Sequence, residues 1–183
     1  MTGLASKRQL RASLVRWALF TVPLVLLLGF LSGRVGSNAD SPWFQSLVKP
    51  DIFPTPMWFG IVWTVLYVLM GIALAMVCAA WGARGRTAAM VAFALQLAVN
   101  LAWSPVFFAM HRIREGLIVI GVLDVLVVIT IVLFWRVRRW AAVLLLPYLA
   151  WIAFATLLNW EFLQANPDGG REVQSGAVQR YEF

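Results

Sequence analysis

The chain has 183 residues, of which 62% are hydrophobic and only 13% are charged, and its net charge is +7. A soluble domain is about 45–50% apolar, so this composition indicates a membrane protein. Nucleic-acid binding is disfavoured, because the Lys and Arg residues fall in short gaps between apolar runs, where they suit anionic lipid headgroups rather than a basic protein face.

Five apolar segments are long enough, or nearly so, to cross a bilayer core of about 30 Å, which takes about 20 helical residues. In chain order they are Trp17–Gly33, Met57–Ala83, Thr87–Met110, Gly116–Trp135 and Trp140–Trp160. Only short gaps follow the second, third and fourth segments, so consecutive helices must be antiparallel neighbours. The sequence therefore predicts an all-α, integral, multi-pass membrane protein, a bundle of five transmembrane helices within residues 17–165.

The two ends of the chain differ from this apolar domain. Residues 1–16 are a basic extension, and residues 166–183 form a polar tail that we expect to be disordered. The basic extension, the first apolar run and Ser37-Asn38-Ala39 together also fit a secretory signal peptide. The length of the apolar run favours a retained helix, and the distribution of Lys and Arg favours an N-terminus on the inner side. A bacterial cell membrane and a mitochondrial-type outer membrane both fit.

The loop between the first two segments, residues 34–56, contains Pro50, Pro54 and Pro56. Each proline fixes its own φ and biases the residue before it away from the helical region. The loop is therefore predicted to be a stiff lid at the membrane surface, with the second helix starting just after Pro56.

Three segments carry an aromatic or amide stripe at helical spacing, so that the members of each stripe share one face. The amides turn inward, because an amide that faces lipid would lose its hydrogen bonds. The stripes consist of Gly60, Trp63, Tyr67 and Gly71; of Gln96, Asn100, Trp103 and Phe107; and of Tyr148, Trp151, Ala155 and Phe162. They predict either a shared ligand chamber or ordinary aromatic packing.

Two further features have a functional and a structural interpretation each. Asp124 is the only ionisable residue deep within a segment, so it marks a functional site or a hydrogen bond that fixes helix packing. Ala94, Ala98 and Ala102 recur every four residues, which permits close approach of a second helix. This stripe is interpreted as a homodimer seam, the alternative being contact within one subunit.

Five motifs together resemble one known family, the TspO/MBR family of tryptophan-rich sensory proteins and translocator proteins. They are "PWFQSLVKP" (residues 42–50), "FPTPMWFGIVWTVLY" (53–67), "QLAVNLAWSPVFF" (96–108), "LDVLVVIT" (123–130) and "PYLAWIAFATLLNWEF" (147–162). The resemblance implies a five-helix fold, commonly homodimeric, with a pocket beneath the first loop. It also implies ligands such as protoporphyrin IX.

The resemblance assigns roles to particular residues. Trp63 and Trp151 match two pocket tryptophans that support light-dependent porphyrin breakdown in some bacterial members, so they are the catalytic candidates. Trp43 and Phe44 match an aromatic pair of the loop. The chain departs from the family pattern at Ile52, where the loop commonly has Trp, and in its interrupted proline pair. Positions near the pocket are matched by Asn100, Phe107, Asp124 and Ala155.

The function predicted from the sequence is a membrane sensory protein that binds a tetrapyrrole, with Lys49 meeting a propionate group. Metal-free protoporphyrin IX is the preferred ligand, since no histidine lies deep in a helix to hold haem iron. No obligatory cofactor or metal site is expected. The alternatives are a photo-oxidative enzyme and a transporter of porphyrin or lipid. The predicted ligand-binding residues are Trp43, Phe44, Lys49, Trp63, Tyr67, Gln96, Asn100, Trp103, Phe107, Asp124, Tyr148, Trp151 and Ala155.

Overall fold

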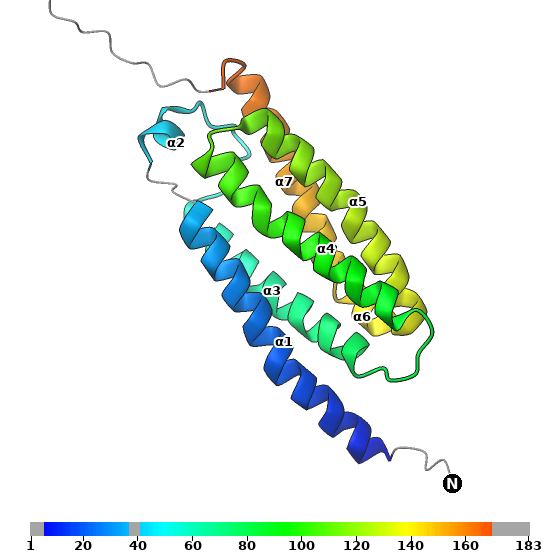
Figure 1. The fold of residues 1–183 in the computed structure, drawn as a ribbon. Helices are drawn as coiled ribbons and strands as arrows, with labels where there is room; N and C mark the ends of the chain where they lie inside the picture. The colour runs from blue at the N-terminus through cyan, green and yellow to red at the C-terminus, as the bar shows by residue number, and fades with distance from the viewer. Residues whose placement is uncertain (1–5, 37–40, 170–183) are drawn as a thin grey trace, which may run out of the picture.

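The computed structural model describes residues 6–36 and 41–169, and within these ranges every regular element is a helix (Figure 1). Five stretches are long and apolar enough to cross a membrane, which confirms the prediction of a multi-pass five-helix protein. The elements are α1 (Lys7–Gly36), α2 (Pro42–Ser46), α3 (Pro56–Cys78), α4 (Arg86–Ser104), the π-helix η1 (Pro105–Ala109), α5 (Ile113–Val137), α6 (Arg139–Val143) and α7 (Leu146–Ala165). The third span joins α4 to η1, and the fifth joins α6 to α7.

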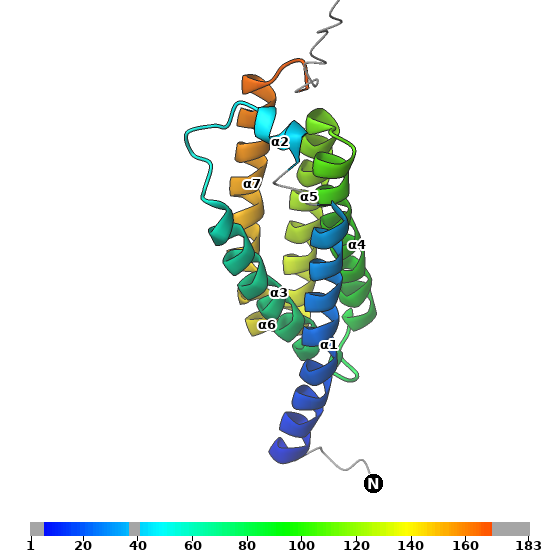
Figure 2. The same cartoon turned by 90° about the vertical axis from the view of Figure 1, so that its left-hand side faces the viewer.

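The helices form an up-and-down bundle in which α1 packs mainly on α3, α4 on α5, and α5 on α7. The N-terminal part of α1 projects beyond the bundle at the end opposite α2 (Figures 1 and 2). The first helix thus begins at Lys7, ten residues ahead of the predicted Trp17, because the basic extension continues the same helix.

The second and fifth spans differ from the sequence prediction for local reasons. The second span ends at Cys78 rather than Ala83, and the turn that follows uses Gly82 and Gly85 at φ of 74° and 78°, a region that favours glycine. The fifth span is interrupted between α6 and α7. Pro147, in the first turn of α7, has no N–H to donate to a carbonyl one turn earlier, which suits a helix start.

α1 and α3 approach closely at Gly71 of α3, which faces Val22 of α1. A Cβ on Gly71 would lie 2.6 Å from the backbone Cα of Val22, so only glycine fits between these backbones. The Thr21 hydroxyl donates a hydrogen bond to the Gly71 carbonyl oxygen over 2.8 Å. Small residues and polar side chains of this kind hold helices together where the lipid offers no hydrophobic driving force.

The join between α4 and η1 is explained by Pro105. The Leu101 carbonyl lacks its usual donor four residues on, since proline has no N–H. The Ser32 hydroxyl of α1 donates to that carbonyl oxygen over 2.6 Å. The helix then widens into a π-turn, in which the Met110 N–H donates to the Pro105 carbonyl over 2.9 Å. This exchange of partners ties α1 to α4.

The C-terminal tail was expected to be disordered from Asn166 onward, but residues 166–169 are ordered against the α2 loop. The Asn166 side chain bonds the backbone of Val48, and the Gly169 carbonyl accepts from Trp43. Residues 166–169 thus contact the loop that contains α2. Residues 170–183, and the Ser37-Asn38-Ala39 sequence considered as a cleavage site, lie outside the described residues.

Candidate functional site

A cavity of about 850 Å³ occupies the end of the bundle beneath the α2 loop, and we call it the chamber. Its walls come from residues 26–34 of α1, residues 56–67 of α3, and residues 100–108 of α4 and η1. Phe44 and Phe53 of the loop contribute its roof. The lining is apolar and aromatic with a few polar groups, which is typical of sites that bind small molecules.

The floor of the chamber is the ring of Tyr67, which lies against Gly29 of α1. A Cβ at Gly29 would overlap the Tyr67 ring, so the missing side chain makes room for the floor. The Tyr67 hydroxyl donates to Asn100 Oδ1 over 3.1 Å. Trp63, one turn nearer the loop, stacks on Tyr67 with ring centroids 5.3 Å apart. One aromatic pair thus closes the chamber toward the bundle core.

The back wall is held by a second hydrogen-bonded pair. Trp103 Nε1 donates to Asn159 Oδ1 of α7 over 3.2 Å, and Asn159 Nδ2 donates to the Ile113 carbonyl over 3.0 Å. Trp103 also stacks on Phe107 at 5.3 Å. The indole therefore has a fixed orientation, because both its polar edge and its face have partners.

The roof is formed by residues 41–53, which we call the lid. Ser41 caps α2 by accepting from the Phe44 N–H over 3.2 Å. Phe44 is only 3% exposed and lies 5.2 Å from the ring of Phe108 in η1. Phe53 continues the roof to Phe59 of α3, with ring centroids 5.5 Å apart. The lid is therefore closed over the chamber by a row of aromatic rings.

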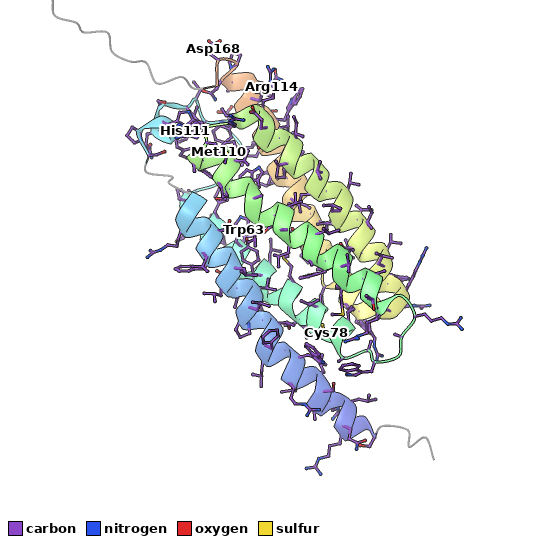
Figure 3. All side chains as sticks on the ribbon, viewed as in Figure 1. Trp63, Cys78, Met110, His111, Arg114 and Asp168 are labelled. Atoms are coloured by element: carbon purple, nitrogen blue, oxygen red, sulfur yellow. The ribbon has the colours of Figure 1, made fainter. Side chains whose placement is uncertain are left out.

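The lid is fastened on its outer side to the end of α7. Asn166 Nδ2 donates to the Val48 carbonyl over 3.0 Å, and the Val48 N–H donates to Asn166 Oδ1 over 2.9 Å. Trp43 stacks on His111 at 4.3 Å and donates through Nε1 to the Gly169 carbonyl over 3.3 Å. Figure 3 shows His111 and Asp168 at this end of the bundle, above Trp63.

Comparison with known proteins identifies the family, because the sequence profile of the TspO/MBR family matches residues 21–164. The chain belongs to the TspO/MBR family. It is similar to the tryptophan-rich protein TspO of Chlorobaculum tepidum, with 40% identity over 147 residues, covering 80% of this chain and 93% of that protein. It is also similar to TspO of Archaeoglobus fulgidus (37% identity; 78% and 92% covered) and to human translocator protein (34% identity; 79% and 88% covered).

In this TspO/MBR protein twelve of the thirteen predicted site residues fall into three groups, and Trp151 lies outside all three. The first group lines the chamber and consists of Phe44, Trp63, Tyr67, Asn100 and Trp103. The second lies behind or outside the lid. There Trp43 and Phe107 belong to a buried aromatic cluster, and the Lys49 ammonium sits 5.3 Å from the Phe44 ring centroid, on the exposed side. The third group lies deeper in the bundle, outside the chamber.

That third group makes helix-to-helix contacts. Tyr148 and Gln96 bond each other in the core, with the tyrosine hydroxyl donating to Gln96 Oε1 over 2.9 Å. Asp124 Oδ2 accepts from the Thr156 hydroxyl over 2.8 Å, which joins α5 to α7. Ala155 is buried in the same region. The bond to Thr156 is a packing contact, whereas Asp124 Oδ1 is buried without a partner among the described residues, so both interpretations of Asp124 stay open.

Trp151 borders a separate shallow groove between α3 and α7 and does not line the chamber. Its ring lies 5.7 Å from that of Phe59, which does line the chamber, so Trp151 is one side chain removed from it. Its indole N–H has no hydrogen-bond partner within the described residues.

Sequence reasoning did not single out Gly29, Ser32, Arg34 or Asn166 as parts of this site. Arg34 lines the chamber at the end of α1, while Asn166 holds the lid. A glycine and a serine at the lid-side end of an apolar helix are signals of close helix contact. Their partners become apparent only when α1 is placed beside α3 and α4.

Proposed function

We propose that this protein is a membrane receptor for a planar anionic tetrapyrrole such as protoporphyrin IX, which it binds in the chamber. The observation that carries the proposal is the aromatic chamber of about 850 Å³ beneath a closed lid. That volume lies within the range of about 300–1,000 Å³ found for small-molecule sites. Trp63, Tyr67 and Trp103 supply flat apolar faces, against which a flat macrocycle stacks well.

The anionic group of the ligand needs a cation at the chamber, and Arg34 supplies it. Arg34 lines the chamber, with its guanidinium carbon 5.4 Å from the Phe30 ring centroid. A guanidinium binds a carboxylate through two parallel hydrogen bonds, which also orients it. Lys49, the cation expected from the sequence, lies outside the chamber over Phe44. We therefore propose that a propionate of the porphyrin pairs with Arg34 rather than with Lys49.

The proposed ligand is metal-free. The residues that line the chamber include no His, Cys or Met side chain to hold haem iron, and the hydroxyl of Tyr67, another possible axial ligand, donates to Asn100 Oδ1 over 3.1 Å instead. The single histidine of the sequence, His111, stacks on Trp43 on the outer side of the lid and does not line the chamber.

Titration of protoporphyrin IX against the wild type and three variants in lipid nanodiscs tests the proposal. Arg34→Gln is expected to weaken binding about tenfold, equivalent to about 1.4 kcal/mol, whereas Lys49→Gln, the matched control, leaves it unchanged. Trp63→Leu is expected to weaken binding by a similar factor, because it removes a stacking face.

The dimethyl ester of the same porphyrin provides a second control, since it has no carboxylate. We expect the wild type and Arg34→Gln to bind the ester equally. Wild-type binding no stronger than partition into empty nanodiscs would disprove the receptor function.

Light-dependent breakdown of the bound porphyrin is a second candidate function. It is favoured by the position of Trp63, an oxidisable ring in the chamber wall that stacks on Tyr67. Under illumination, Trp63→Phe should slow porphyrin bleaching, and Trp151→Phe should slow it less, since Trp151 lies behind Phe59. Equal bleaching by the wild type and both variants would exclude a role for these tryptophans.

We also propose a homodimer through α4. Ala94, Ala98 and Ala102 are exposed on the surface of the monomer, whereas Gln96 and Asn100 on the other face of the helix are buried. An exposed stripe of small residues permits the close backbone approach that membrane helix pairs use. The seam would leave the chamber intact in each subunit.

A further inference from the structure

We propose that the ligand reaches the chamber sideways from the hydrocarbon layer, through a portal between α1 and α3, and not by opening the lid. This inference rests on the proposed function, because it concerns the ligand of the same chamber. It follows from which sides of the chamber are closed by direct contacts and which side is exposed.

The portal has a closed lower end. Figure 2 shows that α1 and α3 meet near the C-terminal end of α3 and separate toward the lid. Contact is made where Gly71 faces Val22 and where Gly29 faces the Tyr67 ring. The Thr21–Gly71 hydrogen bond of 2.8 Å reinforces the same contact. Above Tyr67 the two helices are no longer joined by these contacts.

The exposed side of the chamber lies between the lid-side parts of α1 and α3. Phe30 on α1 lines the chamber, yet 61% of its surface is exposed. On α3 the facing rim is formed by Gly60 and Thr64, which are also both chamber-lining and exposed. The same residues thus face the chamber and the exterior of the bundle, as the edges of an opening do.

The chemistry of this rim suits the bilayer interior. The Thr64 hydroxyl donates to the Gly60 carbonyl over 2.7 Å, so its polar hydrogen is satisfied within the helix. Gly60 has no side chain, and a Cβ built there would meet nothing within 4 Å. The rim is therefore apolar in effect and has free space where the ligand would pass.

The other sides of the chamber are held by contacts that would have to break. Ser32 joins α1 to α4 through its 2.6 Å hydrogen bond to Leu101. The lid is fixed by the two Asn166–Val48 hydrogen bonds and by the buried ring of Phe44. A route through the lid requires all of the lid contacts to open, whereas the side of the chamber between α1 and α3 is lined by exposed residues.

The portal specifies a class of ligand. A molecule that uses it must dissolve in the membrane, lie flat enough to pass between two helices, and carry its anionic group near the lid-side end. Arg34 lies at that end of α1 and is exposed. The class is therefore a flat amphiphile with an apolar body and a carboxylate that stays at the membrane surface.

The test measures binding kinetics with protoporphyrin IX already dissolved in the bilayer. Gly60→Trp places an indole in the portal, and Gly121→Trp is the matched control, because Gly121 on α5 has equally free space but lies away from the chamber. We expect Gly60→Trp to slow association and dissociation at least tenfold each, with the equilibrium Kd changed less than about threefold. Asn166→Ala should leave both rates unchanged.

The portal is disproved if Gly60→Trp has the rates of Gly121→Trp, or if Asn166→Ala speeds association tenfold, which would indicate a route through the lid. If Gly60→Trp weakens the equilibrium affinity itself, a trapping experiment decides. Gly60→Cys, in a Cys78→Ala background, is loaded with porphyrin and then alkylated with N-cyclohexylmaleimide. Alkylation should slow porphyrin release at least tenfold relative to alkylated Gly121→Cys, and equal release would disprove the portal.

The same data separate the two proposals. Failure of the proposed function would appear as no saturable binding of protoporphyrin IX by the wild type. Failure of the portal alone would appear as saturable wild-type binding whose rates do not respond to the side chain at position 60.

Discussion

The contact between α1 and α3 at Gly71 leads to a quantitative prediction about Gly71→Ala. The added Cβ would lie 2.6 Å from Val22 Cα, whereas ordinary contacts are 3.4–4 Å. Neither atom can rotate away, because the Cβ would be bonded directly to the backbone of α3 and Val22 Cα is part of the backbone of α1. The helices must therefore separate by about 1 Å, at an overpacking cost of about 1–3 kcal/mol.

The same separation weakens the hydrogen bond between Thr21 and Gly71. Its 2.8 Å length would rise to about 3.8 Å, beyond hydrogen-bond range, with a loss of about 0.6–1.7 kcal/mol for a bond between membrane helices. Alanine is the better helix former by about 1 kcal/mol, which opposes both losses. Gly121→Ala has the same gain without a clash, so comparison with it cancels this term.

We expect Gly71→Ala to be less stable than Gly121→Ala by about 2–4 kcal/mol, or about 5–10 °C in Tm, measured by thermal unfolding in detergent. In a Thr21→Val background the penalty of Gly71→Ala should shrink, because the hydrogen bond is already absent. If Gly71→Ala and Gly121→Ala unfold at the same temperature, the close approach of α1 and α3 is wrong. The closed lower end of the portal would then be wrong with it.

Three further changes test other contacts. Ser32→Ala leaves a carbonyl of α4 without its donor and should lower the free energy of unfolding by about 0.6–1.7 kcal/mol, measured by titration with denaturing detergent; no change would contradict the link between α1 and α4. Asn166→Ala removes two hydrogen bonds from Val48 and should speed hydrogen exchange of the Val48 amide about 10–100-fold, whereas an unaltered rate would mean that the lid is held elsewhere. Ala98→Leu should shift the protein from dimer to monomer in mass measurements in mild detergent, while the exposed Ala153→Leu should not; a dimer that survives Ala98→Leu excludes the α4 seam.

Much of the fold was readable from the sequence because its determinants are local. A hydrophobic stretch of sufficient length identifies a membrane span whatever its neighbours, so the five spans and their antiparallel order were predicted correctly. The inward position of Gln96 and Asn100 also followed, since an amide in lipid has no partner. The early start of α1 was missed because a basic sequence says little about whether a helix continues through it.

The composition of the chamber needed the tertiary structure. Helical periodicity groups residues on one face, but a face about 100° wide can meet two or three different neighbours, and the sequence does not say which. Packing placed Trp63 in the chamber and left Trp151 behind Phe59 in another groove. It also brought Arg34 to the chamber, while Lys49 was turned outward over Phe44.

Length, hydropathy and period were thus enough to determine the spans, the buried amide face and the membrane location of this protein. The tertiary structure decided which aromatic rings share one chamber and which cation lies beside it, through the packing of α1 against α3 and α4. The physical reason is that such contacts depend on distances between backbones far apart in sequence, and the chain order of residues does not encode those distances in any local pattern.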